Sequence, residues 1–513
     1  MLFNSYEFLF DFLPLAFLLF WYGGTGIRWR LAVLTFGSYT FYSWWQFSGW
    51  REFVLSLSIT DWKSLGAALW KWRFTLIMLF SSSVDYWAAK WIVGLPPAAR
   101  GPRKLLLALS LAVNLGLLAF FKYFGFFTQI ANDVSRFLGG GDVPIVSMIL
   151  PVGISFYTFE SISYVIDIYR GVARPARSYL DYACFISFFP HLVAGPIIRY
   201  SDILHQFRDV AWARPRPDWH HVSVGLVFFS VGMGKKLLIA DPIAQAVNPL
   251  WTQFSTGESL GLTGSWAAVL GYTFRIYFDF SGYSDMAIGL GHLFAVKLPQ
   301  NFNSPYQATD PSDFWRRWHM TLSSWLRDYL YIPLGGNRRG NQSRNLLITM
   351  LLGGLWHGAA WLFVVWGAWH GLLLVGFHWL KQRNWVLSNE SLATRWVNRM
   401  LTFLLVVIGW VFFRTADVNV ESYGFASVLP AFRMFADMLG LNGLTPATLA
   451  GQIGPLFWCG IAACWAWCNF LPNSQEVGYR SEPTVMHGLL AGTLLAVTVL
   501  QLGSGVDFLY FRF

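Results

Sequence analysis

Long apolar segments separated by short polar ones run along nearly the whole chain. We expect segments that span or partly span a bilayer at residues 8–22, 31–47, 74–93, 105–124, 145–168, 180–198, 222–240, 266–296, 344–378, 397–413, 452–471 and 485–502. A helix needs about 20 mainly apolar residues to cross a bilayer, so the longer runs have room for two passes or a broken helix. The pattern predicts an all-α, polytopic membrane protein with about 12 to 15 crossings and re-entrant pieces.

The charged residues fit this arrangement. The chain is 55% hydrophobic and only 12% charged, with a formal net charge of +10. Lysines and arginines gather in short loops between apolar runs, as in the cytoplasmic loops of membrane proteins, so the charge does not indicate nucleic-acid binding. Successive basic loops cannot all be cytoplasmic if every run crosses once, which favours re-entrant segments. The short alternating segments of a β-barrel are absent.

The cysteines carry no metal-binding signal. All four, Cys184, Cys459, Cys464 and Cys468, lie in apolar segments. No CxxC pair or Cys/His spacing typical of a metal site occurs, so we expect these side chains to pack and we predict no metal site.

Residues 310–371 combine the densest cationic run with histidines beside apolar stretches. Asp310 is a good N-cap and Pro311 suits the first helical position, so we expect a helix from here to about Pro333. At about 100° per residue its apolar side chains share one face, with His319 at the edge. These side chains are Phe314, Trp315, Trp318, Leu322, Trp325, Leu326 and Tyr329. The pattern predicts an amphipathic helix at the membrane surface.

Two further histidines follow, each flanked by glycines. His357 lies between Gly354 and Gly358, and His370 lies between Gly367 and Gly371. Small residues four apart let a second helix approach closely, which makes helix packing one interpretation. The other is a general base, since the ordinary pKa of histidine lies near neutral pH. The spacing alone does not distinguish His357 from His370.

Several polar side chains interrupt other apolar runs, where ionisable groups are costly and often functional. Glu160 and His191 lie in two such runs, and Asp279 and Asp285 lie mid-run in a third. Broken helices and buried carboxylates also suit a transporter. The alternative is a structural role, in which these groups bond freed backbone or fix helix packing.

Three long motifs carry a family resemblance. They are Pro-Val-Gly-Ile-Ser-Phe-Tyr-Thr-Phe-Glu-Ser-Ile-Ser-Tyr (151–164), Tyr-Phe-Asp-Phe-Ser-Gly-Tyr-Ser-Asp-Met-Ala (277–287) and Phe-Trp-Arg-Arg-Trp-His (314–319). With Leu-Trp-His-Gly at 355–358, they resemble the membrane-bound O-acyltransferase (MBOAT) family, and within it the bacterial branch that O-acetylates exopolysaccharides. The resemblance covers most of residues 1–415, and its most recognisable core spans about 145–415.

The resemblance implies one integral-membrane domain over 1–513, with C-terminal helices and an aromatic tail at 452–513. Its fold would be a ring of transmembrane and re-entrant helices around a central funnel. The catalytic histidine of the family matches His357, and a second functional histidine matches His319. His370 then becomes a supporting residue. Further candidates for supporting roles are Trp356, Asp279 and Asp285.

The resemblance also implies the substrates and the setting. We expect acetyl-CoA as co-substrate rather than a bound cofactor, taken from the cytoplasmic side of a bacterial inner membrane. The candidate phosphate-binding residues are Arg316, Arg317, Arg338 and Arg339, although cytoplasmic-loop charge explains them equally well. A periplasmic SGNH-type acetyltransferase or esterase would then complete O-acetylation of a secreted polysaccharide, with alginate first and cellulose second. The alternatives are D-alanyl transfer to teichoic acid and a non-catalytic transporter or flippase subunit.

The C-terminus carries a separate hypothesis. Residues 507–513, Asp-Phe-Leu-Tyr-Phe-Arg-Phe, place the hydroxyl of Tyr510 among hydrophobic side chains. The segment resembles the short aromatic C-terminal motif of bacterial acyl-relay systems, in which a tyrosine carries the acyl group. Tyr510 would then accept acetyl. The alternative is an aromatic anchor at the membrane interface.

Overall fold

The computed structural model describes residues 1–58, 61–146, 148–208, 212, 214–338, 341–418, 425–444, 453–480, 484–503, 506, 508 and 509. Every regular element within these ranges is a helix, which confirms the all-α prediction. The first half contains η1 (Glu7–Phe12), α1 (Leu13–Tyr22), α2 (Ile27–Ser43), η2 (Trp44–Gln46), α3 (Trp50–Ser56), α4 (Trp62–Gly94), α5 (Arg100–Leu118), η3 (Ala119–Tyr123), α6 (Phe124–Phe137), α7 (Ile154–Arg170), α8 (Tyr179–Ser187), α9 (Phe189–Leu192), α10 (Tyr200–Leu204) and η4 (Gln206–Arg208). The second half contains α12 (Trp219–Gly234), η5 (Lys235–Ala240), α13 (Asp241–Ser255), α14 (Gly261–Leu293), η6 (Pro305–Gln307), α15 (Pro311–Arg317), α16 (Met320–Leu326), η7 (Arg327–Tyr331), α17 (Gln342–His357), α18 (Trp361–Gln382), α19 (Leu392–Val418), η8 (Phe425–Val428), α20 (Leu429–Met438), α22 (Pro455–Phe470), α23 (Ser474–Arg480) and α24 (Val485–Val499).

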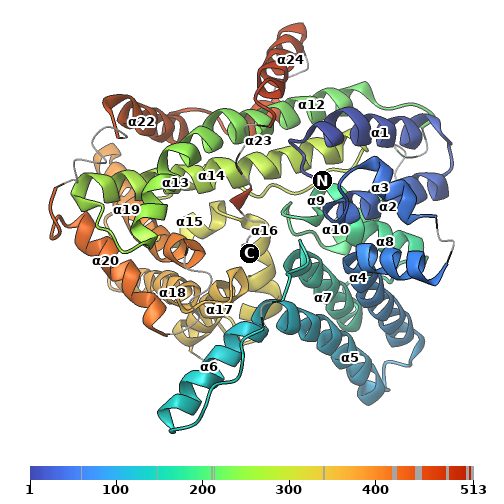
Figure 1. The fold of residues 1–513 in the computed structure, drawn as a ribbon, viewed down its shortest axis with the longest axis horizontal. Helices are drawn as coiled ribbons and strands as arrows, with labels where there is room; N and C mark the ends of the chain where they lie inside the picture. Colours follow the sequence, from blue (N-terminus) through green and yellow to red (C-terminus); the bar gives the residue numbers. More distant parts are fainter. Residues whose placement is uncertain are drawn as a thin grey trace.

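The long helices surround the short helices α15 and α16 (Figure 1). In this view α12, α13 and α14 run along one side, α4, α5 and α7 lie on another, and α17, α18 and α19 close the third. In the described residues, four segments are long and apolar enough to cross a membrane, judged by length and composition. They are Arg100–Phe137, Trp219–Ser255, Trp361–Gln382 and Leu392–Val418. The central funnel stays a prediction.

Side-chain caps explain where several helices begin. Asp61 accepts a hydrogen bond from the Ser64 N–H at the start of α4, and Ser64 bonds back to the Asp61 N–H. Ser178 and Asp181 form the same reciprocal arrangement at the start of α8. Each cap satisfies donors that the first helical turn leaves without an intrahelical partner.

Glycines bring α17 and α18 into close contact, as their spacing predicts. A Cβ atom added at Gly354 would lie 2.2 Å from the carbonyl oxygen of Phe363, and one at Gly367 would lie 2.3 Å from that of Met350. Backbone therefore packs directly on backbone here, which only glycine permits. Because α17 ends at His357, this contact helps to fix the position of that histidine.

We predict that Gly367→Ala destabilises the protein by about 1–3 kcal/mol, because the added methyl group must push α17 away from α18. Gly376→Ala on the same helix is the matched control, since a Cβ atom there meets no atom within 4 Å. We expect it to change stability by less than about 1 kcal/mol. Thermal unfolding of the detergent-solubilised variants measures both. Equal melting temperatures for the two variants would contradict the close-contact interpretation.

Candidate active site

The helix expected from Asp310 to about Pro333 is wrong in one respect, because it is interrupted at His319. It begins as predicted: the Asp310 side chain accepts a hydrogen bond from the Asp313 N–H at 2.7 Å, and Pro311 is the first residue of α15. However, α15 ends at Arg317 and α16 starts at Met320. His319 adopts a left-handed conformation with φ 43° between them. The apolar face is buried as expected, but against protein rather than along a membrane surface, apart from Trp315, which is half-buried.

Residues from a preceding loop explain the break. The Asn303 N–H donates to the Arg317 carbonyl at 2.9 Å, and the Met320 N–H donates to the Asn301 carbonyl at 2.9 Å. Backbone groups that lose their helical partners inside a protein must find others. The loop supplies them, so the chain can turn at His319 and direct its side chain inward.

His319 is fully buried and its ring orientation is fixed by Asn301. The His319 Nδ1 lies 3.1 Å from the Asn301 Oδ1, which also accepts the Thr321 hydroxyl at 2.9 Å. A carbonyl oxygen only accepts, so Nδ1 carries the hydrogen and Nε2 carries the lone pair. Burial lowers the pKa of His319, which keeps the imidazole neutral at neutral pH. This is the form that a general base requires.

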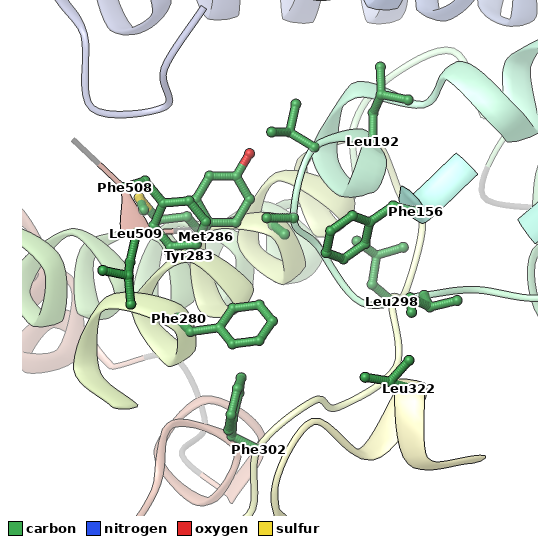
Figure 2. Close-up of a cluster of buried hydrophobic side chains, with 14 of the residues drawn as sticks. Phe156, Leu192, Phe280, Tyr283, Met286, Leu298, Phe302, Leu322, Phe508 and Leu509 are labelled. Atoms are coloured by element: carbon green, nitrogen blue, oxygen red, sulfur yellow. The ribbon is translucent and has the colours of Figure 1, made fainter. Parts of the chain in front are cut away.

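Apolar side chains form the surroundings of His319. Its ring meets Phe280 edge-on at 4.8 Å between centroids. Figure 2 shows Phe280 and Phe302 facing each other in an apolar cluster that also contains Tyr283 and Phe508. Such an apolar lining disfavours water in the neighbourhood of the imidazole.

His357 is the last residue of α17 and is also buried. Its ring packs edge-on against Trp366 at 5.0 Å and Phe413 at 5.2 Å. The ring of Trp356 lies 5.0 Å from His357 and 6.3 Å from His319, so it contacts both imidazoles. Burial lowers the pKa of His357, and His319 lies close enough for a positive charge on its ring to lower that pKa further. The structure thus brings together the two histidines and the tryptophan singled out in the sequence.

His370 lies one helix away, on α18. Its ring stacks on Phe314 of α15 at 6.0 Å and packs against Trp366 at 4.9 Å. Since Trp366 also contacts His357, His370 supports the aromatic wall of the site.

The two candidate carboxylates pair with buried lysines. Asp279 lies 2.9 Å from the Lys236 ammonium and accepts the Leu509 N–H at 2.8 Å. Asp285 pairs with Lys235 at 2.7 Å. These pairs connect α14 to η5 and to the C-terminal segment, so we interpret the carboxylates as anchors of the fold.

The candidate phosphate-binding arginines differ in their surroundings. Arg316 and Arg338 are exposed, whereas Arg317 is half-buried and pairs with Asp313 at 3.0 Å. Arg339 and Tyr510 lie outside the described residues.

Two functional candidates escaped the sequence analysis. Asn301 lies in a polar loop, and nothing in its local pattern indicates a contact with His319. Lys122 lies inside the predicted apolar run 105–124, where a charge is itself a signal of function. Its ammonium donates to the Trp356 carbonyl, and its charge adds to burial in lowering the pKa of the nearby His357.

The fold and the site together define a helical integral-membrane protein with a buried histidine pair suited to base catalysis. The profile of the family "MBOAT, membrane-bound O-acyltransferase family" matches residues 171–416. The "Probable alginate O-acetylase AlgI" of Pseudomonas putida is 36% identical over 538 residues, with 100% of both chains covered. The chain therefore belongs to the membrane-bound O-acyltransferase family, and it is an acyltransferase of the membrane.

The chain is also similar to two relatives that are named for other polymers. The "Peptidoglycan O-acetyltransferase" of Helicobacter pylori is 37% identical over 415 residues, 75% of this chain and 74% of the relative. The "Teichoic acid D-alanyltransferase" of Bacillus subtilis is 27% identical over 288 residues, 53% of this chain and 70% of the relative.

We predict that Asn301→Ala lowers acyl-transfer activity roughly tenfold to a hundredfold, because loss of a buried hydrogen bond costs about 1–3 kcal/mol and frees the His319 ring to take the other tautomer. Activity in isolated membranes measures this. Asn132→Ala is the control, since Asn132 is also buried and bonds both the N–H and the carbonyl of Val143 in a different part of the chain. Wild-type activity in Asn301→Ala, with the protein folded, would contradict the role of Asn301.

Proposed function

We propose that the protein transfers acetyl from a cytoplasmic thioester, acetyl-CoA, for O-acetylation of a secreted polysaccharide. The observation that carries this is the buried pair of His319 and His357, with the lone pair of His319 placed on Nε2 by Asn301. A hydroxyl group attacks a thioester slowly unless a base removes its proton, and a neutral imidazole is suited to that task.

The reaction balances with these groups. The hydroxyl oxygen forms a bond to the acetyl carbonyl carbon while its proton passes to an imidazole nitrogen, and the carbonyl oxygen takes the displaced electron pair. When the carbonyl forms again, the carbon–sulfur bond breaks and the thiolate takes the proton back from the imidazolium. His357 and His319 are our candidates for the catalytic residues, with Trp356 and His370 holding their rings in place.

The donor would arrive at the cytoplasmic face of a bacterial inner membrane. The exposed guanidinium groups of Arg316 and Arg338 are suitable for coenzyme A phosphates, with Arg317 and Arg339 beside them in the sequence. The proposed acceptor polymer lies on the opposite side of this membrane from acetyl-CoA. We therefore propose a periplasmic SGNH-type partner that completes the transfer.

The acceptor proposal follows the relatives. The relative named as an alginate O-acetylase aligns over 100% of the chain, whereas the teichoic acid D-alanyltransferase aligns over 53% at lower identity. Alginate is therefore our first acceptor, ahead of D-alanyl transfer, and cellulose is the second, as the sequence resemblance implies. The peptidoglycan O-acetyltransferase shares the acetyl group and adds peptidoglycan as a further acceptor to test.

The C-terminal segment supports a relay through Tyr510. Phe508 stacks on Tyr283 at 4.6 Å, and the Leu509 N–H is held by Asp279 at 2.8 Å. Phe508 also lies 6.3 Å from Phe280, whose ring contacts His319. The residues immediately before Tyr510 are thus anchored beside the site, as a tyrosine that receives acetyl would require.

We predict that His357→Ala abolishes transfer of labelled acetyl from acetyl-CoA, a loss of about 10²–10⁴-fold, since proton transfer by a positioned base contributes about this factor. The assay uses membranes with wild-type or variant protein, supplemented with the periplasmic fraction. Label should reach a periplasmic protein or polysaccharide only with wild type. Equal labelling would mean that His357 is structural, and would favour the transport hypothesis.

We predict that Tyr510→Phe stops labelling of the acceptor, because the variant keeps the aromatic ring but lacks the hydroxyl that would carry acetyl. Peptide mass spectrometry of wild type should find acetyl on Tyr510. Tyr6→Phe, a change at an exposed tyrosine, is the control. Full acetylation by Tyr510→Phe would refute the relay and support the interfacial anchor, leaving the role of His357 untouched.

A further inference from the structure

The end of helix α17 is held by two consecutive side chains from η3. A helix leaves its last carbonyls without intrahelical partners, and α17 ends in the protein interior at His357. The Tyr123 hydroxyl donates to the Leu355 carbonyl at 2.8 Å, and the Lys122 ammonium donates to the Trp356 carbonyl. The two peptide groups that lead into His357 are therefore both bonded from the same turn of η3.

Lys122 connects three elements at this point. Besides the Trp356 carbonyl, its ammonium donates to the Ser155 hydroxyl at 3.1 Å, which ties η3 to α7. It also lies 5.6 Å from the centre of the Trp356 ring. A positive charge is favourable at the negative end of a helix dipole, which offsets part of the cost of burying it.

The contact is made from a π-helical turn, η3. Residues Ala119–Tyr123 form a π-helix inside the apolar segment Arg100–Phe137. Such a turn widens the helix locally and is common at functional sites. Two neighbouring residues of this turn, Lys122 and Tyr123, bond two neighbouring carbonyls of α17.

We propose that Lys122 and Tyr123 form a clamp that positions His357 for acyl transfer. The proposal rests on the proposed function of His357 as a base. Trp356 contacts both imidazoles, so a shift of its peptide group moves a ring that packs against each of them. The clamp residues act through α17 and are positioning residues.

The test compares variants of the clamp in full-length protein in membranes, with acetyl-CoA as donor. We expect Lys122→Met to lower kcat about tenfold to a hundredfold with KM for acetyl-CoA changed less than twofold, because the donor-binding residues are untouched. Tyr123→Phe should lower kcat by less, about threefold to tenfold, since one neutral hydrogen bond is lost. Lys122→Arg keeps a donor and a charge, and should recover most of the activity.

Two controls match the chemistry elsewhere in the chain. Lys71→Met removes a lysine that bonds the Gln46 carbonyl, and Tyr179→Phe removes a hydroxyl that bonds Ser83. Both should keep kcat within twofold. Gel filtration and melting temperature in detergent establish that each variant is folded.

The outcomes separate the clamp from the proposed function. Normal kcat in both Lys122→Met and Tyr123→Phe, with His357→Ala inactive, overturns the clamp and leaves the proposed function standing. Activity retained in His357→Ala overturns the proposed function itself. The clamp is also overturned if kcat falls in Lys122→Met and Tyr123→Phe only in proportion to the loss of folded protein and Lys122→Arg does not restore it.

Discussion

The centre of the protein depends on how the backbone around His319 is satisfied. A left-handed non-glycine residue costs roughly 1–2 kcal/mol, and two helical hydrogen bonds are given up at the same place. Asn301 and Asn303 return both bonds through their own backbone, and the Asn301 side chain then holds the imidazole. The loop that contains Asn301 and Asn303 thus replaces the lost helical hydrogen bonds and also fixes the tautomer of His319. Without it, a regular helix would carry His319 at the edge of its apolar face.

Two of the π-helical turns in the described residues, η3 and η5, carry lysines that connect one helix to another. The turn η3 presents Lys122 to the end of α17, and η5 presents Lys235 and Lys236 to the carboxylates of α14. Charges removed from water are costly unless paired and hydrogen-bonded, so such residues connect elements that would otherwise share only apolar contacts. Lys236 also donates to the Val506 carbonyl at 2.8 Å, which extends this connection to the C-terminal segment.

Local patterns predicted what depends on local physics. The start of α15 at Pro311, its buried apolar face and the close approach at Gly354 and Gly367 all follow from capping, helical period and side-chain size. The break at His319 could not be predicted this way, because its cause is a loop residue 18 positions earlier. The partners of Asp279 were equally hidden, since Leu509 lies 230 residues away. Sequence motifs therefore located the histidines, whereas the groups that orient them required the fold.

The two histidines are held by different means. His319 is oriented through its side chain, by a hydrogen bond that fixes one nitrogen as donor and leaves the lone pair on the other. His357 is oriented through its backbone, by the end of α17 and the aromatic rings of Trp366 and Phe413. Two imidazolium ions close together in an apolar site would repel each other, so only one ring can hold the reaction's proton at a time. The hydrogen bond from His319 to Asn301 leaves the lone pair on Nε2, while burial and the nearby Lys122 lower the pKa of His357 and so favour the neutral form that a base requires. In the proposed reaction both imidazoles therefore start neutral, and the proton of the attacking hydroxyl is held by one ring at a time.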